Sequence, residues 1–209
     1  MKFRPLKDKP QNKKPKNAWD DDHYTRKAKK DDYPARSVYK LQEIQSKFTL
    51  IKKNDRVLDL GCFPGSWLIH AAELTGQGGR VYGIDLKQVT VKLPPHAKAF
   101  EGDILEPGVL ISEILQEKYR VVLSDMAPAT TGMKDVDAAR SFELSSMALS
   151  VAERVLEQGG SFVCKIFQGE DMTMFIENVR AVFEKHKLFK PESCRKQSKE
   201  IYIIGLEKK

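Results

Sequence analysis

The chain has 209 residues, of which 41% are hydrophobic, and its mean hydropathy is −0.47, so it is long and apolar enough for one domain with a real core. No apolar run approaches the roughly 18 residues that a membrane helix requires, and no apolar stretch follows the basic N-terminus as in a secretory signal. Cys62, Cys164 and Cys194 form no C-x-x-C pair, which argues against a zinc site or a disulfide framework and favours a reduced, cytosolic compartment.

Positive charge is concentrated at the N-terminus. Residues 1–30 contain 11 Lys or Arg and 4 Asp, whereas residues 31–209 contain 25 basic and 25 acidic residues. The sequence therefore predicts a basic, largely disordered tail over 1–30 and a folded domain over 31–209. A basic arm on a neutral body suggests RNA as a partner, although a solvated leader without a partner explains the composition equally well.

From Pro34 onward, helical and strand patterns alternate. Helices are predicted over residues 35–47, 66–74, 110–117, 136–157 and 172–185. Strands are predicted over residues 56–60, 80–84, 97–100, 120–124, 161–164 and 201–206. The pair Gly159-Gly160 is predicted to end the longest helix. This order predicts the α/β class, with a mostly parallel sheet, helices on both faces, and ligands at the carboxyl ends of the strands.

Signals for a cofactor follow the first three strands. Gly61 and Gly65 lie in the turn after the first strand, where glycine lets the backbone approach a ligand. Their spacing is not G-x-G-x-x-G, which disfavours a nicotinamide dehydrogenase. Asp85 follows the second strand, where a carboxylate can accept hydrogen bonds from ribose hydroxyls, and Asp103 follows the third. Each alone could be a turn former or helix cap, but together, in this order, they favour a nucleoside cofactor.

Four charged residues form a candidate catalytic set. Asp125 and Lys165 each come directly after an apolar strand, where burying an ammonium group is costly unless it is paired. Lys40 lies on the first predicted helix and Glu200 opens the last strand. Taken singly, Lys40 and Glu200 fit ordinary surface positions, so Asp125 and Lys165 carry the stronger signal.

At these residues the sequence resembles the FtsJ (RrmJ) family of RNA ribose 2′-O-methyltransferases, over about residues 33–206. The resemblance is carried by Asp59-Leu-Gly with Pro64-Gly-x-Trp67, by Ser124-Asp-Met-Ala-Pro128, by Gly159-Gly-Ser-Phe-Val163, by Lys165-x-Phe-Gln-Gly169, by Arg195 and by Glu200-x-Tyr202. The sequence departs from the family at Ser66, where a second glycine is usual, and at Cys62 and Phe63, where small residues are common.

The resemblance implies a Rossmann-like methyltransferase fold with a seven-stranded sheet and S-adenosylmethionine as cofactor. Its catalytic tetrad would fall on Lys40, Asp125, Lys165 and Glu200. With Gly61 from the turn, the cofactor contacts would be Gly61, Gly65, Trp67, Asp85, Asp103 and Asp125. No metal is expected.

The reaction implied is methyl transfer to a ribose 2′-hydroxyl, with a uridine of large-subunit ribosomal RNA as the expected target. The expected partner is the large ribosomal subunit or its assembly intermediate, and the expected state is a cytoplasmic monomer without membrane contact. A methyltransferase acting on tRNA remains an alternative, as does a non-catalytic RNA-binding assembly factor.

The chemistry requires help for a poorly nucleophilic hydroxyl. We expect Lys165 to be the general base, since partial burial and the like charge of Lys40 favour a neutral amine. The alternative is a protonated Lys165 that stabilises the developing alkoxide. We also expect a positive surface for phosphate contacts beside the pocket. Its candidate residues are Arg26, Lys27, Lys29, Lys30, Arg36, Lys40, Arg195, Lys196 and Lys199.

Overall fold

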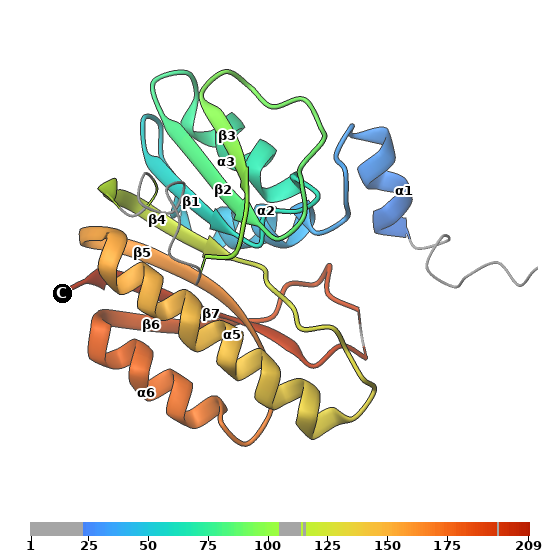
Figure 1. Ribbon diagram of the computed structural model, residues 1–209, viewed down its shortest axis with the longest axis vertical. Helices are drawn as coiled ribbons and strands as arrows, with labels where there is room; N and C mark the ends of the chain where they lie inside the picture. The colour runs from blue at the N-terminus through green and yellow to red at the C-terminus, as the bar shows by residue number, and fades with distance from the viewer. Residues whose placement is uncertain (1–22, 105–113, 115, 196) are drawn as a thin grey trace, which may run out of the picture.

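The protein is built around one seven-stranded sheet, seen in a computed structural model that describes residues 23–104, 114, 116–195 and 197–209 (Figure 1). The strands are β1 (Arg56–Leu60), β2 (Arg80–Asp85), β3 (Ala97–Glu101), β4 (Tyr119–Ser124), β5 (Leu156–Phe167), β6 (Phe183–Phe189) and β7 (Glu200–Lys208). Their order is β3-β2-β1-β4-β5-β7-β6, and only β7 runs antiparallel to its neighbours. The predicted fold class, a mostly parallel sheet of seven strands, is confirmed.

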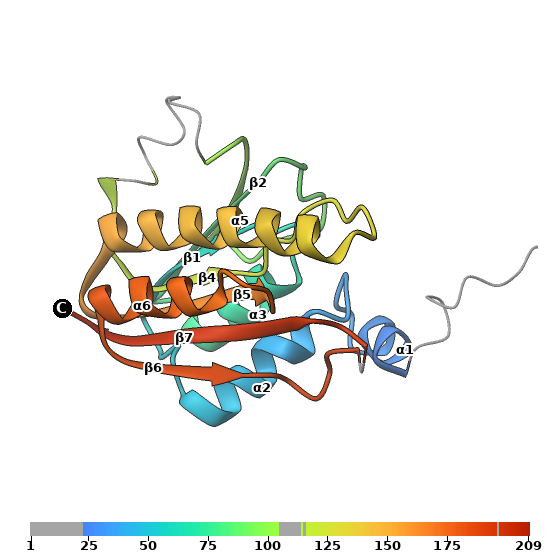
Figure 2. The same cartoon turned by 90° about the horizontal axis from the view of Figure 1, so that it is seen from below.

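Helices cover both faces of this sheet (Figures 1 and 2). The helices are α1 (His23–Lys30), α2 (Val38–Phe48), α3 (Ser66–Thr75), α5 (Lys134–Val155) and α6 (Met172–Val182). Neighbouring strand residues point to opposite faces, so β1 contributes Leu58 to an apolar cluster with α5 and α6, and Val57 to another with α2 and α3. Both side chains are fully buried. The centre of the sheet is therefore covered by apolar side chains on both faces. Polar chemistry is expected at the carboxyl edge of the strands instead.

The last eight residues of the predicted disordered tail are helical and not disordered. Residues 23–30 form α1, and Ala28 is 2% exposed in a small cluster with Val38 and Tyr39 of α2. The Lys27 ammonium also lies 4.3 Å from the centre of the Tyr39 ring. A short apolar contact and this cation–π contact order a segment whose composition alone suggests disorder. Residues 1–22 of the predicted tail lie outside the described residues.

The glycine pair was predicted to end the long helix, and this was wrong. Helix α5 ends at Val155, and β5 starts at once. The register of β4 with β5 shifts between Tyr119 and Val121, and Gly159 has φ 73° there. A Cβ on Gly160 would lie 2.8 Å from the Glu157 carbonyl oxygen. The two glycines lie where the pairing of β5 with β4 is irregular. Glycine is common both at such irregularities and after helix ends, so the sequence alone does not distinguish the two.

The last predicted helix is also shorter than expected, because the chain enters β6 at Phe183. This strand lies at the sheet edge, and exposed charged residues dominate it, as is common for edge strands. Phe183 anchors it by stacking on Phe162 with ring centres 6.0 Å apart. The helix predicted over 110–117 lies largely outside the described residues. Within the described part of the chain, no helix is long and apolar enough to cross a membrane.

Candidate active site

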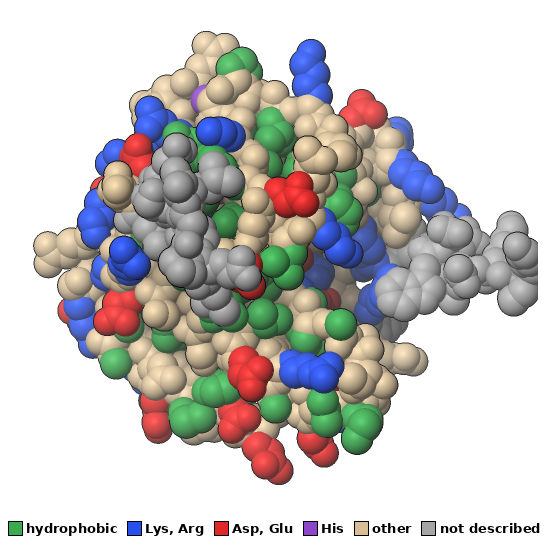
Figure 3. Space-filling view, in the orientation of Figure 1, with side chains coloured by type: hydrophobic (Ala, Val, Ile, Leu, Met, Phe, Trp, Pro, Cys, Tyr) green, Lys and Arg blue, Asp and Glu red, His purple; other side chains and the backbone are tan. Residues whose placement is uncertain are grey.

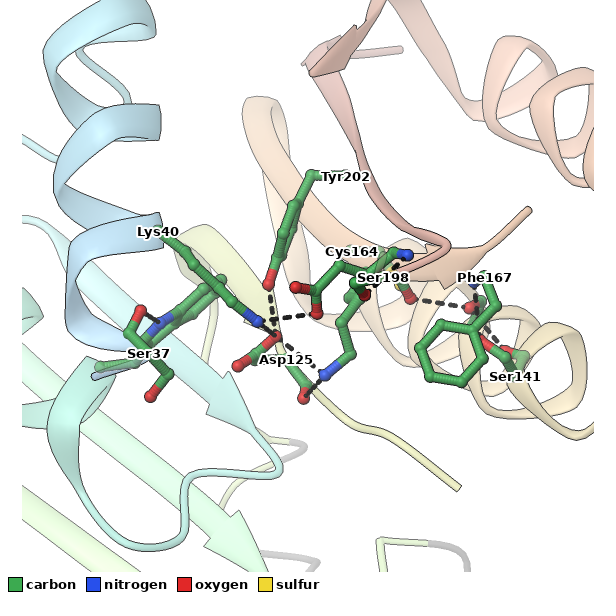
Figure 4. A network of polar contacts seen from close by, with 12 residues as sticks. Ser37, Lys40, Asp125, Ser141, Cys164, Phe167, Ser198 and Tyr202 are labelled. Carbon is green, nitrogen blue, oxygen red and sulfur yellow. Dashed lines mark hydrogen bonds and ion pairs between the residues drawn. The ribbon is translucent and has the colours of Figure 1, made fainter. Parts of the chain in front are cut away.

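The carboxylate of Asp125 is the centre of a buried polar network at the carboxyl edge of the sheet (Figure 4). Asp125 comes directly after β4, so the strand delivers its side chain to this edge. Its Oδ1 accepts a hydrogen bond from the Tyr202 hydroxyl at 2.5 Å and lies 3.0 Å from Lys165 Nζ and 3.9 Å from Lys40 Nζ. One carboxylate oxygen thus faces two ammonium groups and one phenol.

Lys165 is held by both parts of Asp125. Its Nζ donates to the main-chain oxygen of Asp125 at 2.6 Å as well as facing the carboxylate. The side chain is only 6% exposed. The main chain of Lys165 is fixed too, because the Ser145 hydroxyl of α5 donates to its carbonyl at 3.0 Å. These contacts leave the amine in one place, as a group that acts on a reacting atom requires.

Lys40 and Glu200 form the second half of the network. The Lys40 ammonium of α2 lies 2.8 Å from Glu200 Oε2 at the start of β7. Burial disfavours the charge on Lys40, but the carboxylates of Asp125 and Glu200 outweigh it and raise its pKa. Burial likewise opposes the charges on Asp125 and Glu200, but the lysines outweigh it and lower both pKa values. The structure therefore brings all four residues of the predicted tetrad together, and the ionised forms of Lys40, Asp125 and Glu200 stabilise one another.

Tyr202 belongs to this network and was not among the predicted site residues. Burial, and then the charge of Asp125, raise the pKa of Tyr202 far above its usual value, so the phenol stays a neutral donor. Its ring packs on Trp67 with centres 5.9 Å apart. A signal was present in the sequence, since alternate residues of a strand share a face and Tyr202 comes two residues after Glu200.

A cavity of about 580 Å³ opens beside Asp125 on the side of β1, β2 and β3. Its lining includes four of the predicted cofactor residues, Gly61, Asp85, Asp103 and Asp125. The apolar walls of this cavity are formed by Leu60, Ile84, Ile104, Met126, Leu144 and Met147. A mostly apolar cavity with a few convergent polar groups and this volume suits a small nucleoside ligand.

The backbone turn around Gly61 shapes this cavity for a close ligand. Gly61 has φ 78°, and a Cβ there would lie 2.5 Å from Met126 Cγ. Asp85 is oriented by two main-chain donors, because Phe63 N–H lies 3.0 Å from Oδ2 and Lys87 N–H lies 2.9 Å from Oδ1. A fixed carboxylate at the end of β2 is suited to ribose hydroxyls. The residues present thus fit S-adenosylmethionine, whose adenosine needs apolar walls and a ribose acceptor.

Two predicted cofactor contacts, Gly65 and Trp67, lie outside the lining of this cavity. Gly65 has φ 112° at the start of α3, and a Cβ there would lie 2.8 Å from Val91. Trp67 is 3% exposed, and its indole N–H donates to the Ser37 carbonyl at 2.8 Å. The structure places Gly65 against a neighbouring loop, and places Trp67 of α3 against the Ser37 carbonyl ahead of α2 and the ring of Tyr202.

A second cavity, of about 710 Å³, lies on the other side of the tetrad. It is lined by Arg36, Ser37, Lys40, Arg195, Gln197, Ser198 and Glu200. Three of these side chains are cations and one is a carboxylate. Asp125 lines the first cavity, whereas Lys40 and Glu200 line the second. Asp125 therefore borders the mostly apolar cavity with its carboxylates, and Lys40 and Glu200 border the positively charged one.

No group of three potential metal ligands occurs among the residues that the structure describes. Cys62, Cys164 and Cys194 are buried free thiols, and burial first of all raises the pKa of each.

Comparison with known proteins agrees with this geometry. The chain is 60% identical over 204 residues to "Ribosomal RNA large subunit methyltransferase E" of Desulforapulum autotrophicum, covering 98% of this chain and 100% of that protein. It is 46% identical to the protein of the same name from Treponema denticola, covering 89% of this chain and 94% of that one.

Solved structures agree as well. A ribosomal RNA methyltransferase, described as putative, from Plasmodium falciparum superposes with a TM-score of 0.71 at 29% identity, covering 84% of this chain and 98% of that one. Aeropyrum pernix fibrillarin, solved with S-adenosyl-L-methionine, has a TM-score of 0.57 at 16% identity, covering 81% of this chain and 76% of that one, and shows the shared fold. A family model described as FtsJ-like methyltransferase matches residues 33–208. The chain therefore belongs to the FtsJ-like methyltransferase family, and its methyl donor is S-adenosylmethionine.

Proposed function

We propose that this enzyme transfers a methyl group to a ribose 2′-hydroxyl, in a uridine of large-subunit ribosomal RNA. The observation that carries the reaction is the position of the tetrad between two cavities, with Lys165 Nζ 3.0 Å from Asp125 Oδ1 and 6% exposed. The names of the relatives support the ribosomal target. The proposed partner is the large subunit or its assembly intermediate, met in the cytoplasm by a monomeric enzyme.

Each residue of the tetrad has a proposed role in this reaction. When bound, S-adenosylmethionine supplies a methyl group made electrophilic by a positively charged sulfur. A ribose hydroxyl placed beside the tetrad would lose its proton to Lys165 Nζ as its oxygen accepts the methyl group that the bound donor would supply. Lys165 must therefore reach that hydroxyl at about 2.6–3.2 Å in its neutral form. Asp125 holds Lys165 in position, and the Lys40–Glu200 pair orients the ribose.

The proposed cofactor residues act by binding and orientation. Asp85 accepts from ribose hydroxyls of the donor, Asp103 lies at the same edge, and Gly61 lets the main chain approach. Gly65 and Trp67 contribute by supporting the turn and the tetrad from behind, as their contacts suggest. Alignment of the hydroxyl, methyl and sulfur can lower the barrier by several kcal/mol, up to roughly 7–11 in ideal cases.

The proposal is tested with methyl-labelled S-adenosylmethionine and unmethylated large subunits, with small subunits and bulk tRNA in parallel. Nuclease digestion and mass spectrometry then locate the label. We expect a 2′-O-methyl nucleotide in the large subunit that Lys165→Ala abolishes. Label in tRNA would overturn the target and keep the reaction. Cofactor binding without any transfer would favour a non-catalytic assembly factor.

A further inference from the structure

The Asp85 carboxylate joins two segments that line the cofactor cavity. Its Oδ2 accepts the N–H of Phe63, in the turn between β1 and α3, at 3.0 Å, and its Oδ1 accepts the N–H of Lys87, in the loop after β2, at 2.9 Å. The same loop meets the turn a second time, because a Cβ on Gly65 would lie 2.8 Å from Val91 Cγ2. The main chains of Phe63 and Lys87 are therefore fixed relative to each other.

The side chains of Phe63 and Lys87 also meet. Lys87 Nζ lies 5.4 Å from the centre of the Phe63 ring, which is a cation–π distance. Both residues line the cofactor cavity and both are exposed, so the ring and the ammonium lie on its solvent side. Phe63 occupies a position where small residues are common in the family that the sequence resembles. The contact is therefore a feature of this chain that the resemblance does not imply.

The Lys87 ammonium differs from the lysines of the tetrad in its partners. Lys40 Nζ lies 2.8 Å from Glu200 Oε2, and Lys165 Nζ lies 3.0 Å from Asp125 Oδ1. Lys87 forms no ion pair with any carboxylate in the part of the chain that the structure describes. An anionic group of a ligand could thus bind Lys87 without displacing an existing ion pair.

The charges that line the cofactor cavity are mostly negative. Among the described lining residues, Asp85, Asp103 and Asp125 are acidic and Lys87 is the one cation. S-adenosylmethionine carries two positive groups, the sulfonium and the α-ammonium, and one carboxylate. The acidic residues can balance the positive groups, but they repel the carboxylate. Lys87 is the lining side chain with the charge that this carboxylate requires.

The surface of the molecule also brings both signs of charge together. The face drawn in Figure 3 is hollowed near its middle, and basic, acidic and apolar side chains all occur around this hollow. Such a surface suits a ligand that carries both signs of charge within a short length, as the amino-acid part of the methyl donor does.

We propose that Lys87 binds the carboxylate of S-adenosylmethionine, and that Phe63 is the positioning residue that holds the Lys87 ammonium in place. Asp85 is the proposed acceptor for the donor's ribose hydroxyls, and the amino-acid chain of the donor leaves from the same ribose. The long side chain of Lys87 starts beside Asp85 and can extend along that chain. The inference uses the proposed role of Asp85 and not the RNA target, so a failure of the ribosomal assignment leaves it standing.

The carboxylate contact is tested by calorimetric titration of the full chain with two probes. S-adenosylhomocysteine contains the amino-acid part, whereas 5′-methylthioadenosine has the same adenosine and sulfur without it. We expect Lys87→Met to raise the Kd for S-adenosylhomocysteine about three- to tenfold, as for a partly exposed charged contact, and to leave the Kd for 5′-methylthioadenosine unchanged. The matched control is Lys92→Met, in the same loop but outside the cavity lining, which should bind both probes like the wild type.

The pattern of losses decides between the possible roles of Lys87. Lys87→Arg keeps the charge and should stay close to the wild type with both probes. Equal losses of the two probes in Lys87→Met would show that the side chain supports the cavity as a whole, and would overturn the proposal. An unchanged Kd for S-adenosylhomocysteine would overturn it too, and a raised KM for RNA in the same variant would then place the ammonium on the RNA.

The positioning role of Phe63 is tested by a double-mutant cycle. Phe63→Leu keeps an apolar side chain and removes the ring, so it should weaken S-adenosylhomocysteine less than Lys87→Met does and spare 5′-methylthioadenosine. Because the ring acts through the ammonium, Phe63→Leu combined with Lys87→Met should bind S-adenosylhomocysteine as well as Lys87→Met alone. Losses that add in the double variant, or a loss of 5′-methylthioadenosine in Phe63→Leu, would mean that Phe63 contacts the cofactor itself and would contradict the positioning role.

Discussion

The two cavities on either side of the tetrad are built in different ways. The cofactor cavity takes its polar residues from the ends of β1, β2, β3 and β4, which are neighbouring parallel strands. The second cavity joins α2 to the start of β7, and its Lys40–Glu200 pair spans 160 residues of sequence. The first is a product of local strand–turn patterns, whereas the second exists only once the antiparallel strand is in place. The tetrad links the two cavities, since Asp125 lines the first and Lys40 and Glu200 line the second.

The largest loss of methyl-transfer rate is expected from a substitution in the tetrad, where the two cavities meet. Lys165→Met removes the proposed proton acceptor and should lower the single-turnover rate by about 10²–10⁴-fold, the usual contribution of general acid–base catalysis. Both ligands should still bind, because each cavity keeps its own wall. The measurement is methyl transfer with saturating enzyme, together with separate titrations of cofactor and RNA.

The role of Lys165 is sharpened by a pH–rate profile. If Lys165 is the base, the wild-type rate rises with pH as the ammonium loses its proton, and this rise is absent in Lys165→Arg. A rate in Lys165→Arg close to that of the wild type would instead support a protonated side chain that stabilises the alkoxide.

Gly61→Ala should damage the cofactor cavity alone. The added Cβ meets Met126 Cγ at 2.5 Å and occupies a backbone with φ 78°, so we expect the Kd for S-adenosylmethionine to rise about tenfold or more. Gly76→Ala is the matched control, since Gly76 has φ 64° with no atom within 4 Å of an added Cβ. Equal losses in the two variants would show backbone strain and not the cavity wall to be the cause.

Glu200→Gln should weaken the tetrad on the side of the second cavity and make the stability of the protein less dependent on pH. The folded pKa of Glu200 lies below its usual 4.5, so its charge stabilises the fold above that value. This stabilisation is lost as pH falls through the lowered folded pKa. We expect the unfolding free energies of wild type and variant to differ by about 1 kcal/mol at neutral pH. The difference should shrink below pH 4.5, as followed by urea unfolding at several pH values.

The smallest effect is expected from Tyr202→Phe. This change removes the 2.5 Å hydrogen bond to Asp125 and keeps the ring against Trp67, so the rate should fall tenfold or less, within the range for one such bond. Tyr119→Phe is the control, because its hydroxyl is equally buried but donates to the Ile114 carbonyl at 3.1 Å, away from the tetrad. A larger rate loss in the control would contradict a specific role for Tyr202.

The contrast between a cavity built from local strand ends and one built from distant segments also explains what the sequence alone could predict. The turn at Gly61 and the acidic residues after β2, β3 and β4 could be located because a strand end and its ligand-binding residue are neighbours in the chain. The four charged residues predicted as a set do lie together in the structure. For Lys40 and Glu200 that prediction depended on resemblance to a family, since each alone fits an ordinary surface position.

The parts that escaped prediction depend on tertiary contacts. Strand β6 has the charged pattern of an exposed edge, and only its packing on β7 makes it a strand. The glycine pair at 159–160 could end a helix or shape a strand, and the register of β4 decides between the two. Glu43 resembles any helical surface carboxylate until the chain brings Ser193 back to it.

The reversed direction of β7 has a practical consequence for handling the protein. Glu200 pairs with Phe167 at the carboxyl edge, so the strand starts beside the tetrad and runs away from it toward Lys208. The last residue, Lys209, donates its N–H to the Val182 carbonyl at the end of α6. An affinity tag or fluorescent reporter fused after Lys209 would emerge at the opposite rim of the sheet from the tetrad, and α1 lies across the molecule from this end of the chain (Figure 1). Immobilisation through the C-terminus thus leaves the side of the tetrad open for RNA to approach.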